Sequence, residues 1–160
     1  MLILNSGGTF NKKYNPIDGS LEVLYNNDVI EEILRSSVKK YNIAGVVYKD
    51  SLEMTNDDRK MIANIIAHSD EKEFIIVHGT DTMSETAEFL DTVFDDRVIV
   101  LVGSMKPYDI DKVEASLNLG MALGYIQAEK KSGIYICMSG YIEPWHKLVK
   151  NKEQGKFEIV

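Results

Sequence analysis

The chain has 160 residues, of which 44% are hydrophobic and 27% are charged. This length and composition predict one folded domain over residues 1–160 and argue against a disordered or fibrous protein. The formal net charge of −7 repels phosphate backbones and anionic lipid surfaces, so we expect neither nucleic acid nor a membrane as a partner.

The first part of the chain predicts two buried strands and one helix. A short apolar run at residues 2–5 is typical of a strand buried on both faces. The polar stretch at 11–22 is too long for a simple turn between strand and helix, so we interpret it as a candidate lid. Helical periodicity follows at 27–40, and a second apolar run lies at 45–48.

The second part of the chain repeats this alternation. Helices are predicted over 56–68, 83–94 and 112–130, and buried strands over 74–78, 98–102 and 133–138. The last helix has an apolar stripe at helical spacing, which we expect to pack into the core. The stripe consists of Val113, Leu117, Gly120, Met121, Gly124 and Tyr125. The last strand contains the only cysteine, Cys137, so an internal disulfide and a cysteine-based zinc site are excluded.

Alternating strands and helices predict an α/β fold. We expect three α/β/α layers around a mainly parallel, flavodoxin-like sheet. Because the sequence has no leader pattern at its amino terminus and no run of 18 apolar residues, we also expect a cytoplasmic protein.

Three glycine-led loops follow predicted strands, at the sheet edge where ligands bind in such folds. They are Ser6-Gly-Gly-Thr9, Gly79-Thr-Asp-Thr82 and Gly103-Ser-Met-Lys-Pro107. Glycine allows close approach of the backbone to a ligand, and amides at a helix start can hold an oxyanion. Each loop also has a plain structural interpretation, since glycine is a common turn residue and Thr82 with Glu85 matches a helix capping box. Their occurrence at one edge favours a binding site.

Three longer segments around these loops closely resemble the signature segments of the bacterial L-asparaginase family. The segments are Ser6-Gly-Gly-Thr-Phe10, Val77-His-Gly-Thr-Asp-Thr-Met-Ser-Glu-Thr-Ala87 and Val102-Gly-Ser-Met-Lys-Pro107. The resemblance implies an amidohydrolase that converts L-asparagine to L-aspartate and ammonia through a threonine acyl-enzyme, with no metal or organic cofactor. It also implies a small-molecule amide as the partner of the site.

The resemblance assigns candidate catalytic residues. Thr9 corresponds to the nucleophilic threonine, and Thr80 and Asp81 correspond to the second threonine and its adjacent aspartate. That threonine works with a lysine beyond the fifth strand. Counting forward without gaps gives Lys150, and Lys147 is a competitor because the surrounding motif differs. Such a lysine can act as a base for a hydroxyl that is a poor nucleophile by itself.

The resemblance also implies a set of substrate-binding residues, namely Ser51, Thr80, Asp81, Ser104 and Tyr14, the last as a lid tyrosine. His78 lies inside the motif at a strand end, and we interpret it as structural rather than as a base. Leu52 stands where many relatives have a polar residue near the substrate carboxylate.

The family's second, smaller domain has no counterpart in these 160 residues. Because the lone catalytic domain leaves uncovered a surface that relatives bury, we expect a homo-oligomer. Two other functions stay open: hydrolysis of glutamine or another small amide, and a non-catalytic module that binds an amino acid. The nucleophile, its partner threonine and a lysine favour catalysis, since a binding module needs a pocket but no nucleophile.

Overall fold

The computed structural model describes residues 1–128 and 131–160, and its centre is a six-stranded sheet. The strand order is β4-β1-β5-β6-β7-β8, in which the first five strands are parallel and β8 is antiparallel. The strands are β1 (Leu2–Gly7), β4 (Asn42–Lys49), β5 (Glu73–Val77), β6 (Val98–Val102), β7 (Gly133–Met138) and β8 (Tyr141–Pro144).

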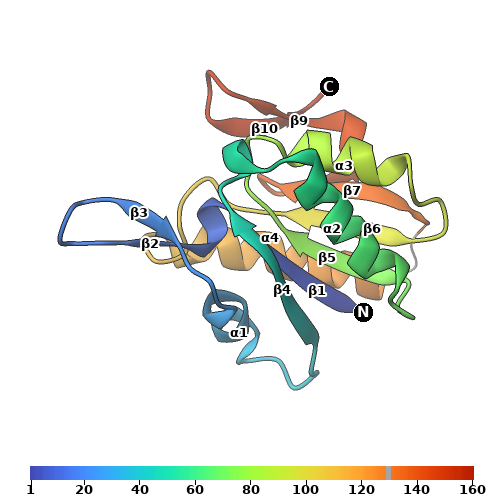
Figure 1. Cartoon of the computed structure of the whole chain (residues 1–160), viewed down its shortest axis with the longest axis horizontal. Helices are drawn as coiled ribbons and strands as arrows, with labels where there is room; N and C mark the ends of the chain where they lie inside the picture. Colours follow the sequence, from blue (N-terminus) through green and yellow to red (C-terminus); the bar gives the residue numbers. More distant parts are fainter. Residues whose placement is uncertain (129–130) are drawn as a thin grey trace.

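Four α-helices connect the parallel strands, and two small hairpins lie outside the sheet (Figure 1). The helices are α1 (Asp28–Leu34), α2 (Asn56–Ala67), α3 (Met83–Asp91) and α4 (Lys112–Gln127). One hairpin pairs β2 (Lys12–Tyr14) with β3 (Leu21–Val23), and the other pairs β9 (Leu148–Asn151) with β10 (Lys156–Ile159). Three short 3-10 turns are η1 (Thr9–Asn11), η2 (Ser51–Glu53) and η3 (Trp145–Lys147).

The predicted three-layer α/β/α fold is confirmed. Helices α2 and α3 pack on one face of the sheet, and α1 and α4 pack on the other. Figure 1 shows α2 and α3 in front of the sheet and α4 behind it. The sheet residues alternate between the two resulting cores: Leu101 of β6 faces α2 and α3, whereas Val100 and Val102 face α4.

The expectation that all five strands are buried on both faces is wrong for β4. This strand lies at the edge of the sheet, and only Val46 among its residues is buried. Edge position depends on strand order, and the composition of an isolated strand does not specify that order. The central strands β5 and β6 are buried as predicted.

One connection has the opposite hand to the others. The connection from β1 to β4 moves toward one edge of the sheet and crosses the face that α1 covers. The connections from β4 to β5 and from β5 to β6 move toward the other edge and cross the opposite face. Reversing both the direction and the face preserves the hand, so these three connections share one hand. The connection from β6 to β7 also moves away from β4, but its helix α4 lies on the same face as α1. Because nearly all such connections are right-handed, β6-α4-β7 is a left-handed exception.

The predicted core stripe of the last helix is only partly correct, because Met121 and Tyr125 are partly buried against the core and other members are exposed. Val113 and Leu117 are 74% and 53% exposed, and the residues that pack on the sheet form a different stripe. That buried stripe consists of Ala115, Leu119, Ala122, Leu123 and Ile126. Apolar residues lie around most of α4, so periodicity alone does not identify the buried face. Val113 and Leu117 therefore leave an exposed apolar surface on α4, the outer stripe.

Three helices are clearly shorter than predicted, and one of them, predicted over 83–94, ends at Asp91. The helix predicted over 27–40 ends at Leu34, where Arg35 and Ser37 donate tighter i to i−3 hydrogen bonds and the chain turns toward β4. Val38 in this turn is 97% exposed, so no core contact holds a further helical turn in place. Helix α4 ends at Gln127, and the last predicted positions, 129 and 130, lie outside the described residues.

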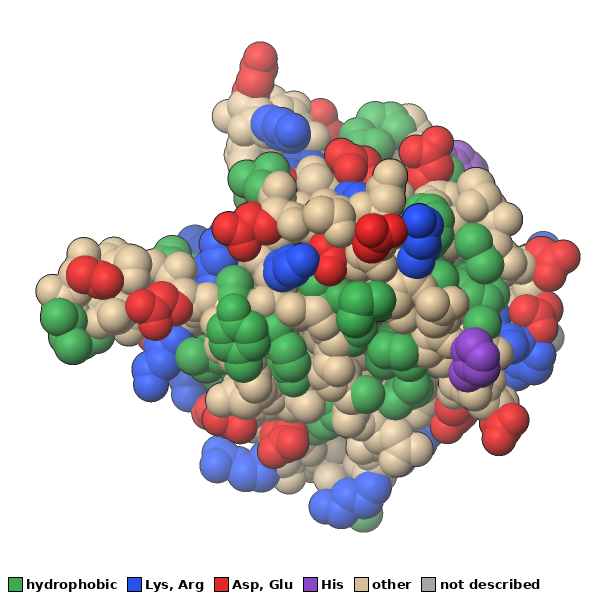
Figure 2. Space-filling model, viewed as in Figure 1, with side chains coloured by type: hydrophobic (Ala, Val, Ile, Leu, Met, Phe, Trp, Pro, Cys, Tyr) green, Lys and Arg blue, Asp and Glu red, His purple; other side chains and the backbone are tan. Residues whose placement is uncertain are grey.

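Cys137, in the strand predicted over 133–138, is a buried free thiol, and burial raises the pKa of Cys137 to about 12. Among the described residues, no helix is long and apolar enough to cross a membrane. On the face in Figure 2, acidic and basic side chains are interspersed rather than gathered by sign.

Candidate active site

The candidate site lies where the strand order of the sheet reverses. Strand β1 pairs with β4, the next strand of the six-stranded sheet along the chain, on one side and with β5 on the other. The loops after β1 and β5 therefore leave the sheet side by side. The first loop carries Thr9 and the second carries Thr80. This is the edge at which open parallel sheets bind ligands.

Glycines bring the backbones of these loops into direct contact. Gly7 and Gly8 both have positive φ angles, 95° and 76°. A Cβ on Gly8 would lie 2.3 Å from the amide nitrogen of Gly79, and a Cβ on Gly7 would lie 2.7 Å from that of Lys49. The two glycines therefore allow three loops to meet without intervening side chains.

A bulge in β4 directs the third loop toward this point. Asn5 is opposite Gly45, but Gly7 is opposite Lys49, so β4 contains two extra residues, and both have positive φ: Val47 (71°) and Tyr48 (51°). Such backbone angles are costly for these residue types. A chain of hydrogen bonds holds the distortion, because the Tyr48 hydroxyl and the Asn5 amide both donate to the Asn27 side chain.

The lysine comes from the β9-β10 hairpin. Leu148 and Phe157 are buried in the core beside α3, and the amide of Phe157 donates to the Ser139 hydroxyl. Lys150 lies opposite Phe157 in the hairpin. Lys147, the competing candidate, is exposed on η3.

Lys150 joins the threonine and the aspartate of the second loop. Its Nζ donates to Thr80 Oγ1 and to Asp81 Oδ1, each at 2.8 Å. Thr80 is 4% exposed, and the side chains of Lys150 and Asp81 are 13% and 32% exposed. A mostly buried ion pair therefore holds the lysine nitrogen against a hydroxyl, which is the geometry needed to move a proton to or from that oxygen.

Ser51 packs directly behind this pair. Its hydroxyl accepts a hydrogen bond from the Asp81 amide at 3.2 Å, and its backbone carbonyl accepts one from the Thr82 hydroxyl at 2.8 Å. Thr82 therefore ties the β4 and β5 loops together and does not cap α3 with its side chain, as the capping-box interpretation required. Sequence spacing contains no signal for this contact because the partners are 31 positions apart.

Thr9 is more accessible than Thr80. It begins η1, is partly exposed, and its hydroxyl forms no hydrogen bond with any described residue. The backbone amides of Thr9 and Thr80 are also unused by the described residues. The site thus contains an available hydroxyl and two available N–H donors, which are the groups that acyl transfer requires.

Two of the predicted substrate-binding residues, Ser104 and Tyr14, do not join the cluster formed by Ser51, Thr80 and Asp81 in this structure. Ser104 is fully buried, and its hydroxyl donates to the Lys106 carbonyl at 2.6 Å, so in this structure it stabilises a turn. Tyr14 is 47% exposed on β2. The predicted lid is the β2-β3 hairpin, which projects away from the sheet in Figure 1, and its tip lies far from the loops. The described residues contain no cluster of three or more side chains suited to a metal.

His78 supports the second loop from within the core, as its structural interpretation predicts. Its Nε2 lies 2.8 Å from the Thr86 hydroxyl, which also accepts a hydrogen bond from Arg59 Nε. The Gly79 carbonyl, 2.7 Å from Nδ1, can only accept, so Nδ1 carries the ring proton and the unprotonated Nε2 accepts from the Thr86 hydroxyl. Neutral His78 satisfies every group in this chain of hydrogen bonds.

We expect His78 to make the fold sensitive to acid. Burial lowers the pKa of His78 to about 4 from 6.5, so as the pH falls below about 6.5 the unfolded chain takes up a proton that the folded chain does not. Stability is lost through this window, by roughly 3 kcal/mol at its lower end. Urea unfolding of wild type and His78→Gln at pH 7.5 and 4.5 measures the effect. The variant should lose about 2–3 kcal/mol less than wild type between the two pH values, and equal losses would contradict the assignment.

A comparison with protein families gives one match across nearly the whole chain. Residues 1–155 match the family model described as "Asparaginase, N-terminal". The chain is 44% identical over 73 residues to a protein named "Probable L-asparaginase periplasmic" from Haemophilus influenzae, and the match covers 43% of this chain and 21% of that protein.

Solved structures show the same fold. The thermostable L-asparaginase from Thermococcus kodakarensis superposes with a TM-score of 0.85 at 23% identity, over 99% of this chain and 50% of that one. A structure titled probable cytoplasmic L-asparaginase, from Campylobacter jejuni, has a TM-score of 0.81 at 24% identity over 99% of this chain and 52% of that one. The chain thus spans about half the length of these two structures.

Proposed function

The chain belongs to the asparaginase family, and we propose that it is an amidohydrolase that converts L-asparagine to L-aspartate and ammonia. The observation that carries the proposal is the Lys150 ammonium held 2.8 Å from the Thr80 hydroxyl, on a loop whose backbone meets the loop that carries the free Thr9 hydroxyl. A module that only binds an amino acid needs neither the lysine nor two threonine hydroxyls at one sheet edge.

In the proposed reaction Thr9 is the nucleophile. Its Oγ1 attacks the side-chain amide carbon, ammonia leaves, and the resulting ester on Thr9 is hydrolysed by water. The Thr80 hydroxyl and the Lys150 amine relay protons during these steps. The free amides of Thr9 and Thr80 stabilise the oxyanion, an effect commonly worth about 3–4 kcal/mol per donor. Asp81 orients Lys150 and pairs with the substrate ammonium group.

The test of the proposal is ammonia release by the purified chain. We expect asparagine to be a better substrate than glutamine, because one methylene in a fitted pocket changes discrimination by about 1–3 kcal/mol. N-acetylasparagine should be a poor substrate because it lacks the ammonium group that Asp81 pairs with. The deciding measurement is kcat/KM for the three compounds side by side. Equal values for asparagine and N-acetylasparagine would remove Asp81 from the ammonium site, and no ammonia from any of them would reject the enzymatic proposal.

We also propose that residues 1–160 form one catalytic domain that assembles into a homo-oligomer in the cytoplasm. The relative from C. jejuni is named cytoplasmic, and the buried Cys137 thiol suits a reducing compartment. The outer stripe of α4 supports self-association because its exposed side chains, including Val113 and Leu117, are uncharged on a chain whose net charge is −7. Two copies approach each other there with little electrostatic repulsion.

Leu117→Glu is expected to dissociate the oligomer. The substitution places a charge in the apolar stripe of α4, and two-fold packing would bring the charge against its own copy. Light scattering at micromolar protein concentration should give a larger assembly for wild type and about 18.1 kDa for the variant. Lys131→Glu is a control at a charged, exposed position. A monomeric wild type would reject the proposed oligomer.

A further inference from the structure

A second ion pair lies at the edge of the candidate site and takes no part in the proposed proton relay. Lys12 Nζ donates to Asp50 Oδ2. Lys12 follows Thr9 by three positions, and Asp50 immediately precedes Ser51. The side chains of Lys12 and Asp50 are 17% and 27% exposed, so the pair is partly shielded but open to a ligand.

Asp50 is fixed by more than the lysine. Its Oδ1 accepts a hydrogen bond from the Leu52 amide at 3.0 Å, which caps η2. Burial opposes ionisation of this carboxyl, but the hydrogen bonds from Lys12 and Leu52 and the charges of Lys12 and Lys150 outweigh it and hold the pKa of Asp50 below its ordinary value. Asp50 is therefore a fixed anion close to both lysines, and it determines where the Lys12 ammonium lies.

A positively charged side chain would be a strong partner for a carboxylate in the substrate. Lys150 already pairs with Asp81 and contacts Thr80. Leu52, beside the site, is apolar and 70% exposed, so its side chain offers no hydrogen-bond donor. An ammonium group has three N–H donors, and Lys12 uses one of them on Asp50. Lys12 therefore has the positive charge and the free donors that a carboxylate requires.

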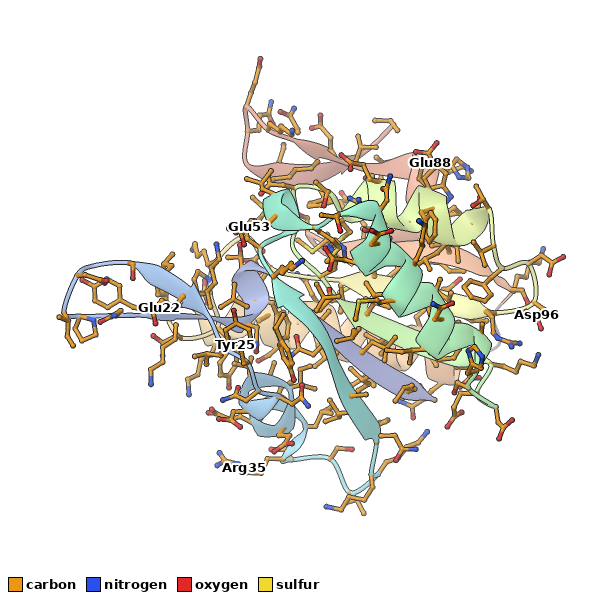
Figure 3. All side chains as sticks on the ribbon, in the orientation of Figure 1. Glu22, Tyr25, Arg35, Glu53, Glu88 and Asp96 are labelled. Atoms are coloured by element: carbon orange, nitrogen blue, oxygen red, sulfur yellow. The ribbon has the colours of Figure 1, made fainter. Side chains whose placement is uncertain are left out.

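Lys12 is also reachable from solvent. Lys12 and Asp50 line an open cleft of about 490 Å³ between the β2-β3 hairpin and η2. Figure 3 labels three other residues of its lining, Glu22 on the hairpin, Glu53 on η2 and Tyr25 between β3 and α1 in the chain.

We propose that Lys12 binds the α-carboxylate of the substrate and that Asp50 is the residue that positions it. The inference rests on the proposed function and narrows its substrate class to amides that carry a free carboxylate. The zwitterion of asparagine is then bound at both ends, its carboxylate by Lys12 and its ammonium by Asp81. This arrangement satisfies both charges when the substrate is buried.

The test uses three amides that share the reacting group. Succinamic acid is asparagine without its ammonium group, and 3-aminopropanamide is asparagine without its carboxylate. Lys12→Met should raise KM for asparagine and succinamic acid by about 10- to 100-fold, the range expected for a hydrogen bond between charged groups. Its kcat/KM for 3-aminopropanamide should stay within about twofold of wild type, because that compound makes no contact with Lys12.

Two further variants separate binding from a structural role. Lys13→Met makes the same chemical change at the next position, where the side chain is exposed, and should match wild type on all three compounds. Lys12→Arg keeps the charge and should restore most of the affinity. Equal losses of Lys12→Met on all three amides, or the same losses in Lys13→Met, would overturn the proposal.

A binding measurement separates this proposal from the enzymatic one. If wild type releases no ammonia from any amide, calorimetry with L-aspartate still tests Lys12. Weaker aspartate binding by Lys12→Met than by wild type and Lys13→Met would support the carboxylate site while the enzymatic proposal fails. Equal binding by all three proteins, or no binding by wild type, would overturn the carboxylate site as well.

Discussion

Alanine in place of Thr9, Thr80 or Lys150 is expected to lower kcat for asparagine by about two orders of magnitude or more while leaving the fold intact. Thr9→Ala removes the proposed nucleophile. Thr80→Ala and Lys150→Ala each break the 2.8 Å contact through which we propose that a proton moves. Steady-state ammonia release measures kcat, and circular dichroism with urea unfolding verifies that each variant is folded.

The effects of Thr80→Ala and Lys150→Ala should not add, because the two side chains act as one relay. The double variant is expected to be about as slow as the slower single variant. Lys147→Ala is the matched control, since that lysine is exposed on η3 and lies on the same segment. Full activity in Lys150→Ala together with loss in Lys147→Ala would transfer the role to the competing lysine. Multiplicative losses in the double variant would argue against a shared relay.

Gly8→Ala is expected to have the largest effect on stability of any single methyl group added near the site. Gly8 has φ 76° and ψ −175°, a backbone region that is essentially confined to glycine. The added Cβ would also lie 2.3 Å from the Gly79 nitrogen, so the loops after β1 and β5 must separate. We expect a loss of about 3–5 kcal/mol in the free energy of unfolding. Because Thr9 and Thr80 move apart, kcat should fall by about 100-fold or more.

Gly140→Ala is the control for this variant. Gly140 also has a positive φ, 83°, but no atom lies within 4 Å of a Cβ built there. It should lose only about 1–2 kcal/mol, the backbone cost alone, and it should retain activity. Urea unfolding curves give both values. Similar losses in the free energy of unfolding of the two variants would mean that close packing of Gly8 against Gly79 is not required for stability.

The sequence predicted the elements of the fold better than it predicted their surroundings. The strands at 98–102 and 133–138 have the expected bounds, because a continuous apolar run flanked by polar residues has few other interpretations. The predictions that β4 is buried on both faces and that the outer face of α4 packs into the core were wrong for a common reason. Both depend on which neighbour lies beside the element, and strand order and the hand of a crossover are properties of the whole chain.

The candidate site shows the same division. Thr9, Thr80 and Asp81 were assigned because their motifs resemble those of the bacterial L-asparaginase family, and the glycines of these motifs make close backbone contacts in the structure. The bulge that directs η2 toward these residues could not be predicted from sequence, because Val47 and Tyr48 are residue types that favour ordinary strand geometry. Likewise, the contact between Ser51 and Thr82 joins segments whose proximity only the folded sheet creates.

Lys150 and the threonines belong to parts of the molecule that differ in how firmly they are held. Thr9 and Thr80 leave the central strands, whereas Lys150 lies on the two-stranded β9-β10 hairpin, which is attached chiefly through Leu148 and Phe157. Local opening of such a peripheral element costs less free energy than global unfolding. Detachment of the hairpin would remove the lysine from Thr80 while the six-stranded sheet remains intact. In the proposed enzyme, warming should therefore abolish catalysis before the fold itself melts, and we expect the hairpin rather than the core to set the temperature range of activity.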